Sequence, residues 1–203
     1  MFKISEYWPP INETLTFTYF NADNSSANVA SKFVPDPSTN SIKCFDFVNN
    51  QYQDTWYIRY DPNRGVVEWR DDMILSPPLS YVLGTTKKLV YKNNFEILWG
   101  NEQNIEDLIY NSIQVDPLKS VPPLPNSGWQ IVHFTNHFDK FTDCIGQNWN
   151  DVLEFTYTQT WGNKTTGAIY KMAKGIGPVS INWIAKNENG VFVVGPEIAA
   201  RVT

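Results

Sequence analysis

The feature that most constrains the fold of this chain is the alternation of apolar and polar residues in short runs that end at turn-forming residues. The run from Leu15 to Phe20 (LTFTYF) is the clearest case, because alternation with a period of two places Leu15, Phe17 and Tyr19 on one face of a strand. The stretch 21–26 that follows is rich in Asn, Ser and Asp and predicts a loop. Runs of this kind recur along the sequence, which predicts an all-β protein.

The amino-acid composition supports the same fold class. The 8 Trp, 10 Tyr and 12 Phe suit a pleated, half-buried surface, whereas only 18% of residues are charged. A chain of 203 residues is long enough to bury a full core as one domain. We therefore expect a single β domain over residues 1–203, built as an antiparallel β-sandwich or a curved half-barrel with at most one or two short helical turns.

Two hairpins are predicted in the first half of the chain. Strands at 56–60 and 66–70 flank the sequence DPNRG at 61–65, where Pro restricts φ and Gly accepts a positive φ. A second hairpin is expected from strands at 88–91 and 95–99.

The remaining chain is predicted to continue as an antiparallel meander, because its loops are too short for parallel crossovers. The sequence NIEDLIY at 104–110 is the one plausible helical turn, and the proline-rich stretch 117–125 is interpreted as a connector between two sheets of one domain. The C-terminal strands are expected at 129–134, 152–161, 168–173, 179–185 and 191–194.

Two segments resemble a known group of proteins. The opening residues 7–19 (YWPPINETLTFTY) and residues 170–179 (YKMAKGIGPV) resemble the start and the closing hairpin of uncharacterised exported bacterial β-domains, although the opening lacks the Gly and Trp of their pattern. The resemblance implies a curved antiparallel sheet and favours an extracellular location, and it implies no activity. In physical terms, the two glycines of 173–178 predict a sharp turn between strands rather than a phosphate-binding loop.

Charge and cysteine content exclude several classes of function. The net charge of −5 and the scattered basic residues argue against a nucleic-acid partner, and no apolar run is long enough for membrane insertion. The first residues contain no apolar core of a signal peptide. Cys44 and Cys144 are not expected to form a catalytic pair, and the sequence leaves open whether they form a disulfide.

The two histidines of the chain lie close together in sequence. On a helix, His133 and His137 would share a face and could bind zinc with Asp139 or Asp143 as a further ligand. The residues before them instead predict a strand that runs into a loop, where the two rings would be about 13 Å apart on one face. We therefore expect no metal and no cofactor.

The tryptophans are the strongest functional signal. Trp149 lies in the sequence QNWN and Trp161 precedes Gly162 and Asn163. An indole ring can stack on the apolar face of a sugar, while nearby amides bind its hydroxyl groups. We expect a carbohydrate-binding, lectin-like protein whose partner is a glycan or polysaccharide, and homo-oligomerisation would strengthen weak single sites. The expected ligand-binding residues, taken to lie in loops, are Trp149, Trp161, Asn148, Asn150 and Asn163.

Two other classes of function remain open. Glycosidases use two carboxylates in an aromatic-lined cleft, so a hydrolase or lyase acting on polysaccharide is the first alternative. A structural or assembly protein, whose aromatics form a protein–protein interface, is the second. No catalytic residue is assigned. The acidic residues around the first predicted hairpin are Asp54, Asp61, Glu68, Asp71 and Asp72.

Overall fold

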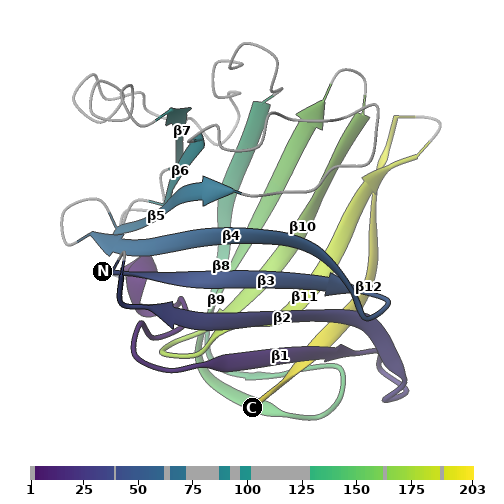
Figure 1. Cartoon of the computed structure of the whole chain (residues 1–203). Coiled ribbons are helices and arrows are strands. Elements are labelled where there is room, and N and C mark those ends of the chain that lie inside the picture. Colours follow the sequence, from purple (N-terminus) through teal and green to yellow (C-terminus); the bar gives the residue numbers. More distant parts are fainter. Residues whose placement is uncertain are drawn as a thin grey trace.

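The computed structural model describes residues 3–38, 40–61, 65–71, 87–91, 97–101, 129–161, 164–187 and 190–203. It describes the side chains of these residues except at 4, 54, 61–134 and 157–166. These residues form one antiparallel sheet of twelve strands and a single short 3₁₀ helix, η1 (Ile4–Glu6) (Figure 1). The strands are β1 (Leu15–Phe20), β2 (Ser26–Asp36), β3 (Ser41–Val48), β4 (Gln51–Asp61), β5 (Gly65–Asp71), β6 (Lys87–Tyr91), β7 (Ile97–Asn101), β8 (Trp129–Thr142), β9 (Asn148–Trp161), β10 (Lys164–Ala173), β11 (Gly177–Lys186) and β12 (Phe192–Val202).

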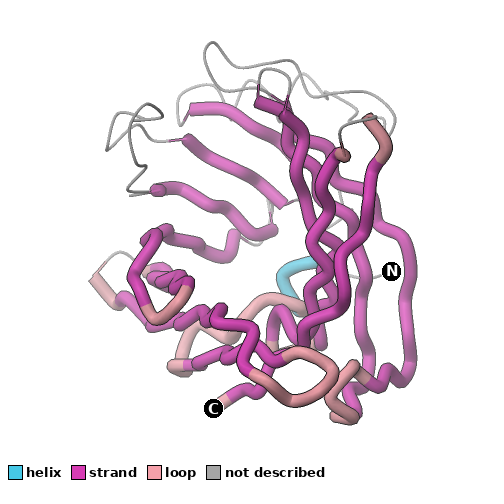
Figure 2. The backbone as a smooth tube through the Cα atoms, turned by 90° about the vertical axis from the view of Figure 1, so that its right-hand side faces the viewer, coloured by secondary structure: helices cyan, strands magenta, loops and turns pink. Residues whose placement is uncertain are grey.

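The sheet consists of two meanders that join where the first strand pairs with the last. Strand order runs from β7 to β1 and then from β12 to β8, with β1 antiparallel to β12. In Figure 1, β1 to β4 run across the view and β8 to β12 run upward behind them. Figure 2 shows that the sheet curves around η1. Within the described residues, the edge strands β7 and β8 do not pair, so the sheet is an open, curved half-barrel.

The main core lies on the inner face of this curve and is rich in aromatic side chains. Phe17 and Tyr19, which the alternation of β1 places on one face, are both buried. The rings of Phe17 and Phe33 meet edge to face at 5.3 Å, and Tyr19 donates a hydrogen bond to the carbonyl of Pro178 at 3.0 Å. Tyr7 and Trp8, which directly follow η1, are buried in the same cluster. The N-terminal segment therefore completes the core that the curved sheet surrounds.

Most of the predicted strands are confirmed. The run 15–20 is β1, and β4 pairs with β5 across the predicted DPNRG turn, with Tyr60 opposite Val66. β6 and β7 form the second predicted pair. The expected helical turn at 104–110 and the proline-rich stretch 117–125 lie outside the described residues. In the described part of the chain, no helix is long and apolar enough to cross a membrane.

The predicted turn at 173–178 is also confirmed, because Ala173 of β10 pairs with Gly177 of β11. Gly175 and Gly177 both have positive φ, at 71° and 120°. A Cβ atom on Gly177 would lie 2.8 Å from Cγ of Pro9. The two glycines thus provide the left-handed backbone of the turn and, at Gly177, a close approach to the N-terminal segment.

Candidate binding site

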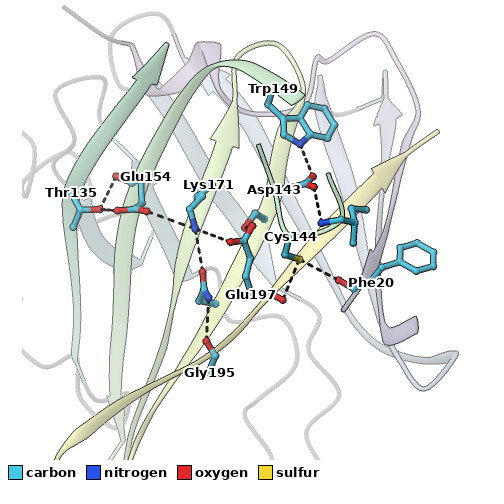
Figure 3. Close-up of polar contacts among 12 residues, drawn as sticks. Phe20, Thr135, Asp143, Cys144, Trp149, Glu154, Lys171, Gly195 and Glu197 are labelled. Atoms are coloured by element: carbon cyan, nitrogen blue, oxygen red, sulfur yellow. Dashed lines mark hydrogen bonds and ion pairs between the residues drawn. The ribbon is translucent and has the colours of Figure 1, made fainter. Parts of the chain in front are cut away.

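The structure places Trp149 at the start of β9 rather than in a loop, so the loop prediction for this residue is wrong (Figure 3). Its indole N–H donates a hydrogen bond to Oδ2 of Asp143 at 2.8 Å, and its half-buried ring packs with Phe138 and Phe141 against a small apolar cluster. Because the polar atom of the indole is already bound and the ring is partly covered, Trp149 offers less free surface to a ligand than the sequence indicated.

Asp143 holds Trp149 because the turn between β8 and β9 folds around its carboxylate. Oδ1 of this buried residue accepts the backbone N–H groups of Ile145 and Gln147, at 3.0 and 2.9 Å. Gly146 takes a positive φ of 84° in the same turn. In the described part of the chain, the hydrogen bonds of Asp143 thus stay within residues 143–149, and its carboxylate stabilises the turn.

The other predicted ligand-binding residues do not gather around Trp149. Asn148 and Asn150 are exposed, and they alternate with Trp149 along β9 and so point to the opposite face. Trp161 is the last residue of β9, roughly 40 Å further along the strand by its rise per residue. It too was predicted in a loop. The side chain of Trp161 and the whole of Asn163 lie outside the described residues, so Trp149 and Trp161 represent two separate positions rather than one groove.

A charged network lies on the outer face of β9 to β12, beside the folded turn of Asp143 (Figure 3). Lys171 is buried, with its ammonium 3.8 Å from carboxylate oxygens of both Glu154 and Glu197 and 3.2 Å from the side-chain oxygen of Asn182. The hydroxyl of Ser180 donates to the second oxygen of Glu197 at 2.8 Å. Since the ammonium is shared among these groups, the network neutralises buried charge and joins four strands.

A second polar cluster lies at the end of the half-barrel, where η1 meets β9 and the β10–β11 turn. Oδ1 of Asp151 accepts a hydrogen bond from the hydroxyl of Tyr7 at 2.6 Å and lies 2.8 Å from Nε2 of His137. Lys174 bridges Oδ2 of Asp151 and the carboxylate of Glu6, at 3.3 and 3.1 Å. We call these five residues the Asp151 cluster.

Electrostatics in the Asp151 cluster favour the ionised carboxylate. Burial raises the pKa of Asp151, but hydrogen bonds from Tyr7, His137 and Lys174 outweigh this effect and hold the pKa below its usual value. The pKa of Lys174 is raised, first by its hydrogen bond to Glu6 and then by that to Asp151. Burial and the hydrogen bond to Asp151 raise the pKa of the Tyr7 hydroxyl. Asp151 and Lys174 therefore stay charged at neutral pH, and the cluster ties the N-terminal segment to the sheet.

The sequence interpretation of the two histidines is corrected by β8. The predicted loop is absent, because β8 continues to Thr142 and contains both His133 and His137. A bulge at Thr135 sets His133 opposite Thr156 and His137 opposite Leu153. These partners are an odd number of residues apart, so the two histidine positions do not share a face as predicted. In the described residues, no three His, Cys, Asp or Glu side chains are grouped to hold a metal ion.

Both cysteines are free thiols, which answers the open question about a disulfide. Cys44 is buried in the main core. Cys144 lies in the β8–β9 turn, where its thiol approaches the carbonyl of Glu197 at 3.4 Å (Figure 3). Burial, followed by the charges of Glu197 and Asp143, raises the pKa of Cys144, so its thiol is a poor nucleophile.

The acidic residues of the first hairpin are placed only in part. Asp54 and Asp61 belong to β4, and Glu68 and Asp71 belong to β5. Their side chains, and the whole of Asp72, lie outside the described residues.

An exposed tryptophan that the sequence analysis did not select lies on β11. Trp183 is 49% exposed although it sits in the middle of a strand of the sheet. Its partner on β10 is Ala168, and Gly195 of β12 lies against its backbone. Because both neighbours are small, neither covers the indole. Its sequence context, INWIA, looks like an ordinary buried strand, which explains why the residue was missed.

The described structure thus defines an all-β protein with one open, curved antiparallel sheet and an exposed aromatic residue on it. No family model and no curated protein matches the chain. Among solved structures, it is similar to a protein from Bacteroides fragilis described as a "putative exported protein with YmcC-like fold", at 9% identity and a TM-score of 0.40 over 100% of this chain and 99% of that one. A "putative lipoprotein" from Parabacteroides distasonis is similar at 7% identity and a TM-score of 0.37, over 97% and 98%. Likenesses this distant carry no inference about the ligand, activity or location of this chain.

Proposed function

We propose that this protein binds a glycan without acting on it, and that Trp183 is the residue on which a sugar ring stacks. The observation that carries the proposal is the exposure of Trp183 between the small residues Ala168 and Gly195. An indole that is open on a firm sheet provides a flat apolar surface at low entropic cost, which suits the C–H face of a sugar.

Trp161 remains part of the proposal as a second stacking residue. In the pairing of β9 with β10, Trp161 is opposite Lys164, and Ala168 is opposite Tyr157. Because residues 157 and 161 lie on the same face of β9, position 161 is on the same face of the sheet as Ala168 and Trp183. β9 and β11, the strands of Trp161 and Trp183, are separated by β10. Two aromatic positions arranged in this way would suit an extended oligosaccharide better than a single monosaccharide. Trp149, whose indole N–H is held by Asp143, is assigned a mainly structural role.

The proposal is tested by screening the purified protein on a glycan array and then measuring affinity for a soluble fragment of the best ligand by calorimetry. Trp183→Ala is expected to weaken binding at least about tenfold, a loss of ~1.4 kcal/mol. Tyr52→Ala is the matched control, because Tyr52 is an exposed aromatic residue on β4, in the other meander. The Tyr52→Ala variant should bind as the wild-type protein does.

Two results would overturn this function. One is the absence of any bound glycan in the array, and the other is an equal loss of affinity in the two variants. Incubation of the protein with its bound glycan should release no new reducing ends, whereas turnover would favour the hydrolase alternative.

A further inference from the structure

Strand β12 is longer than its neighbour β1, and this leaves part of its edge open. β1 pairs only with residues 199–202 of β12, although β12 begins at Phe192. In Figure 1, the upper part of β12 extends beyond β1, with β11 on one side and no strand on the other. An unpaired strand edge presents backbone N–H and C=O groups that another strand can bind.

The direction of the backbone groups can be derived from the turn that precedes β12. The N–H of Asn187 donates to the carbonyl of Val191, so Val191 directs its backbone groups toward β11. Backbone direction alternates along a strand, so Val193 also faces β11, and Phe192 and Val194 direct theirs to the open side. Among the described residues, no strand pairs with Phe192 or Val194 on that side.

The same segment exposes apolar side chains on both faces of the sheet. Residues 191–194 (VFVV) are each between 50% and 58% exposed. Phe192 and Val194 lie on one face and Val193 on the other, which follows from strand alternation. A partner that covered one face of the sheet would leave the apolar side chains of the other face exposed to water. A strand that pairs with the edge of β12 contacts the apolar side chains of both faces.

We propose that β12 pairs with β12 of a second copy of this chain, antiparallel about a two-fold axis at Val193. In this register, Phe192 of each copy lies opposite Val194 of the other, and these two pairs exchange all four of the outward-facing backbone hydrogen bonds. Phe192 also packs against Val194 of the other copy, an aromatic–β-branched pair that stabilises antiparallel sheets. The register is self-complementary, as a two-fold interface requires.

Charge and chain geometry favour a second copy over an unrelated strand. Residues 191–196 (VFVVGP) contain no charged residue, so two copies approach without repulsion between like charges at the axis. A basic group, Lys186, lies on the neighbouring strand β11, with its ammonium 5.7 Å from the centre of the Phe192 ring. Pro196 has no N–H and limits the added pairing to the residues before it. Such a short pairing buries less surface than a standard interface, so the dimer should form reversibly.

This dimer is independent of glycan binding but would strengthen it. Trp183 lies on β11, one strand inside the edge, so pairing of two β12 strands leaves its face open. Two Trp183 sites would then lie on one continuous sheet, which provides bivalent binding.

The experiment is sedimentation velocity of the purified protein over a wide range of concentration, without glycan. The wild-type protein should change from monomer to dimer with concentration. Val194→Lys should raise the dissociation constant at least about tenfold, because it places a charge beside Phe192 of the other copy. Val48→Lys is the matched control, because Val48 is an exposed valine in β3, and this variant should dimerise like wild type. Thermal unfolding should show that both variants are folded.

A second variant gives a positive signal. In the proposed register, Val193 lies opposite Val193 of the second copy, at a separation that a disulfide can span. Val193→Cys should form cross-linked dimers on mild oxidation, and Val48→Cys should not. A wild-type protein that stays monomeric at all concentrations would overturn the proposal, as would a dimer that Val194→Lys leaves intact or a Val193→Cys protein that fails to cross-link. Because none of these measurements involves a glycan, failure here leaves the proposed function untouched.

Discussion

Asp151 shows how a single residue can join parts of the chain that are distant in sequence. It lies within β9 but has a positive φ of 51°, a conformation that Asp tolerates better than most residues. Such backbone strain costs of order 1–3 kcal/mol and persists where surrounding contacts determine the conformation. Here those contacts are the hydroxyl of Tyr7, the ring of His137 and the ammonium of Lys174.

The charge of Asp151 should make the stability of the protein depend on pH. Its pKa is lowered in the folded state, so the carboxylate stabilises the fold above its unfolded pKa of about 3.9, and this contribution is lost as the pH falls through the folded pKa. Asp151→Asn should lower the free energy of unfolding by about 1 kcal/mol at neutral pH. The loss is small because the side chain is partly exposed and solvent screens its charge. The difference from wild type should shrink below about pH 4.

Thermal unfolding followed by circular dichroism across the acid range measures this effect. Asp139→Asn is the control, because Asp139 is 3.9 Å from the same histidine but its side chain is 99% exposed. The control should unfold like wild type at every pH. A difference between Asp151→Asn and wild type that does not change with pH would show that the charge of Asp151 is not what stabilises the fold.

At the scale of elements, the β10–β11 turn has a shape that depends on the N-terminal segment packed against it. The backbone N–H of Gly175 donates to the carbonyl of Glu6 at 2.7 Å. Gly177 lies where any side chain would meet Pro9 and Phe17. The close contact between the two segments therefore depends on the absence of a side chain at position 177.

Two alanine substitutions in this turn separate backbone strain from steric conflict. Gly175→Ala meets open space and should cost about 1 kcal/mol, the penalty of a positive φ alone. Gly177→Ala adds contacts of 2.8 Å with Cγ of Pro9 and 3.2 Å with Cζ of Phe17, and should cost about 3 kcal/mol. Urea denaturation gives both values. Equal losses in the two variants would mean that the N-terminal segment moves aside at no cost.

At the scale of the whole molecule, the first and last strands meet in the middle of the sheet. Thr16 and Thr203 exchange backbone hydrogen bonds at 2.7 and 3.0 Å beside the β1–β12 pairing. Each meander therefore continues into the other through the two terminal strands, and residues from both meanders form the main core.

This arrangement predicts that the chain unfolds as one unit. Differential scanning calorimetry should show a single transition whose calorimetric and van't Hoff enthalpies agree, because neither meander keeps a complete core without the other. Removal of residues 192–203 should abolish the transition rather than lower its midpoint slightly. Two separate transitions would instead indicate two domains.

The sequence by itself determined the fold class, most of the strands and the turns between them. These features depend on neighbours in the chain: alternation along 15–20 sets the inner face of β1, and the two glycines near 175 set the β10–β11 turn. The same rule failed over 135–142, because β8 is an edge strand there and exposes polar residues such as Asn136 and Lys140. Edge residues have no need to alternate, so a regular strand resembles a loop in the sequence.

Only the tertiary structure decided which residues are candidates for function. Trp149 and Trp183 each lie beside Asn in the sequence, but the fold gives them different surroundings. The indole N–H of Trp149 binds the buried carboxylate of Asp143, whereas Trp183 lies between two small residues. The Asp151 cluster likewise joins residues from four segments of the chain, and no local sequence pattern indicates that these segments lie close together: Tyr7, His137, Asp151 and Lys174. Local alternation determines which face of a strand a residue occupies. The exposure and chemistry of its side chain depend on the residues of neighbouring strands, and long-range pairing such as that of β1 with β12 decides which residues these are.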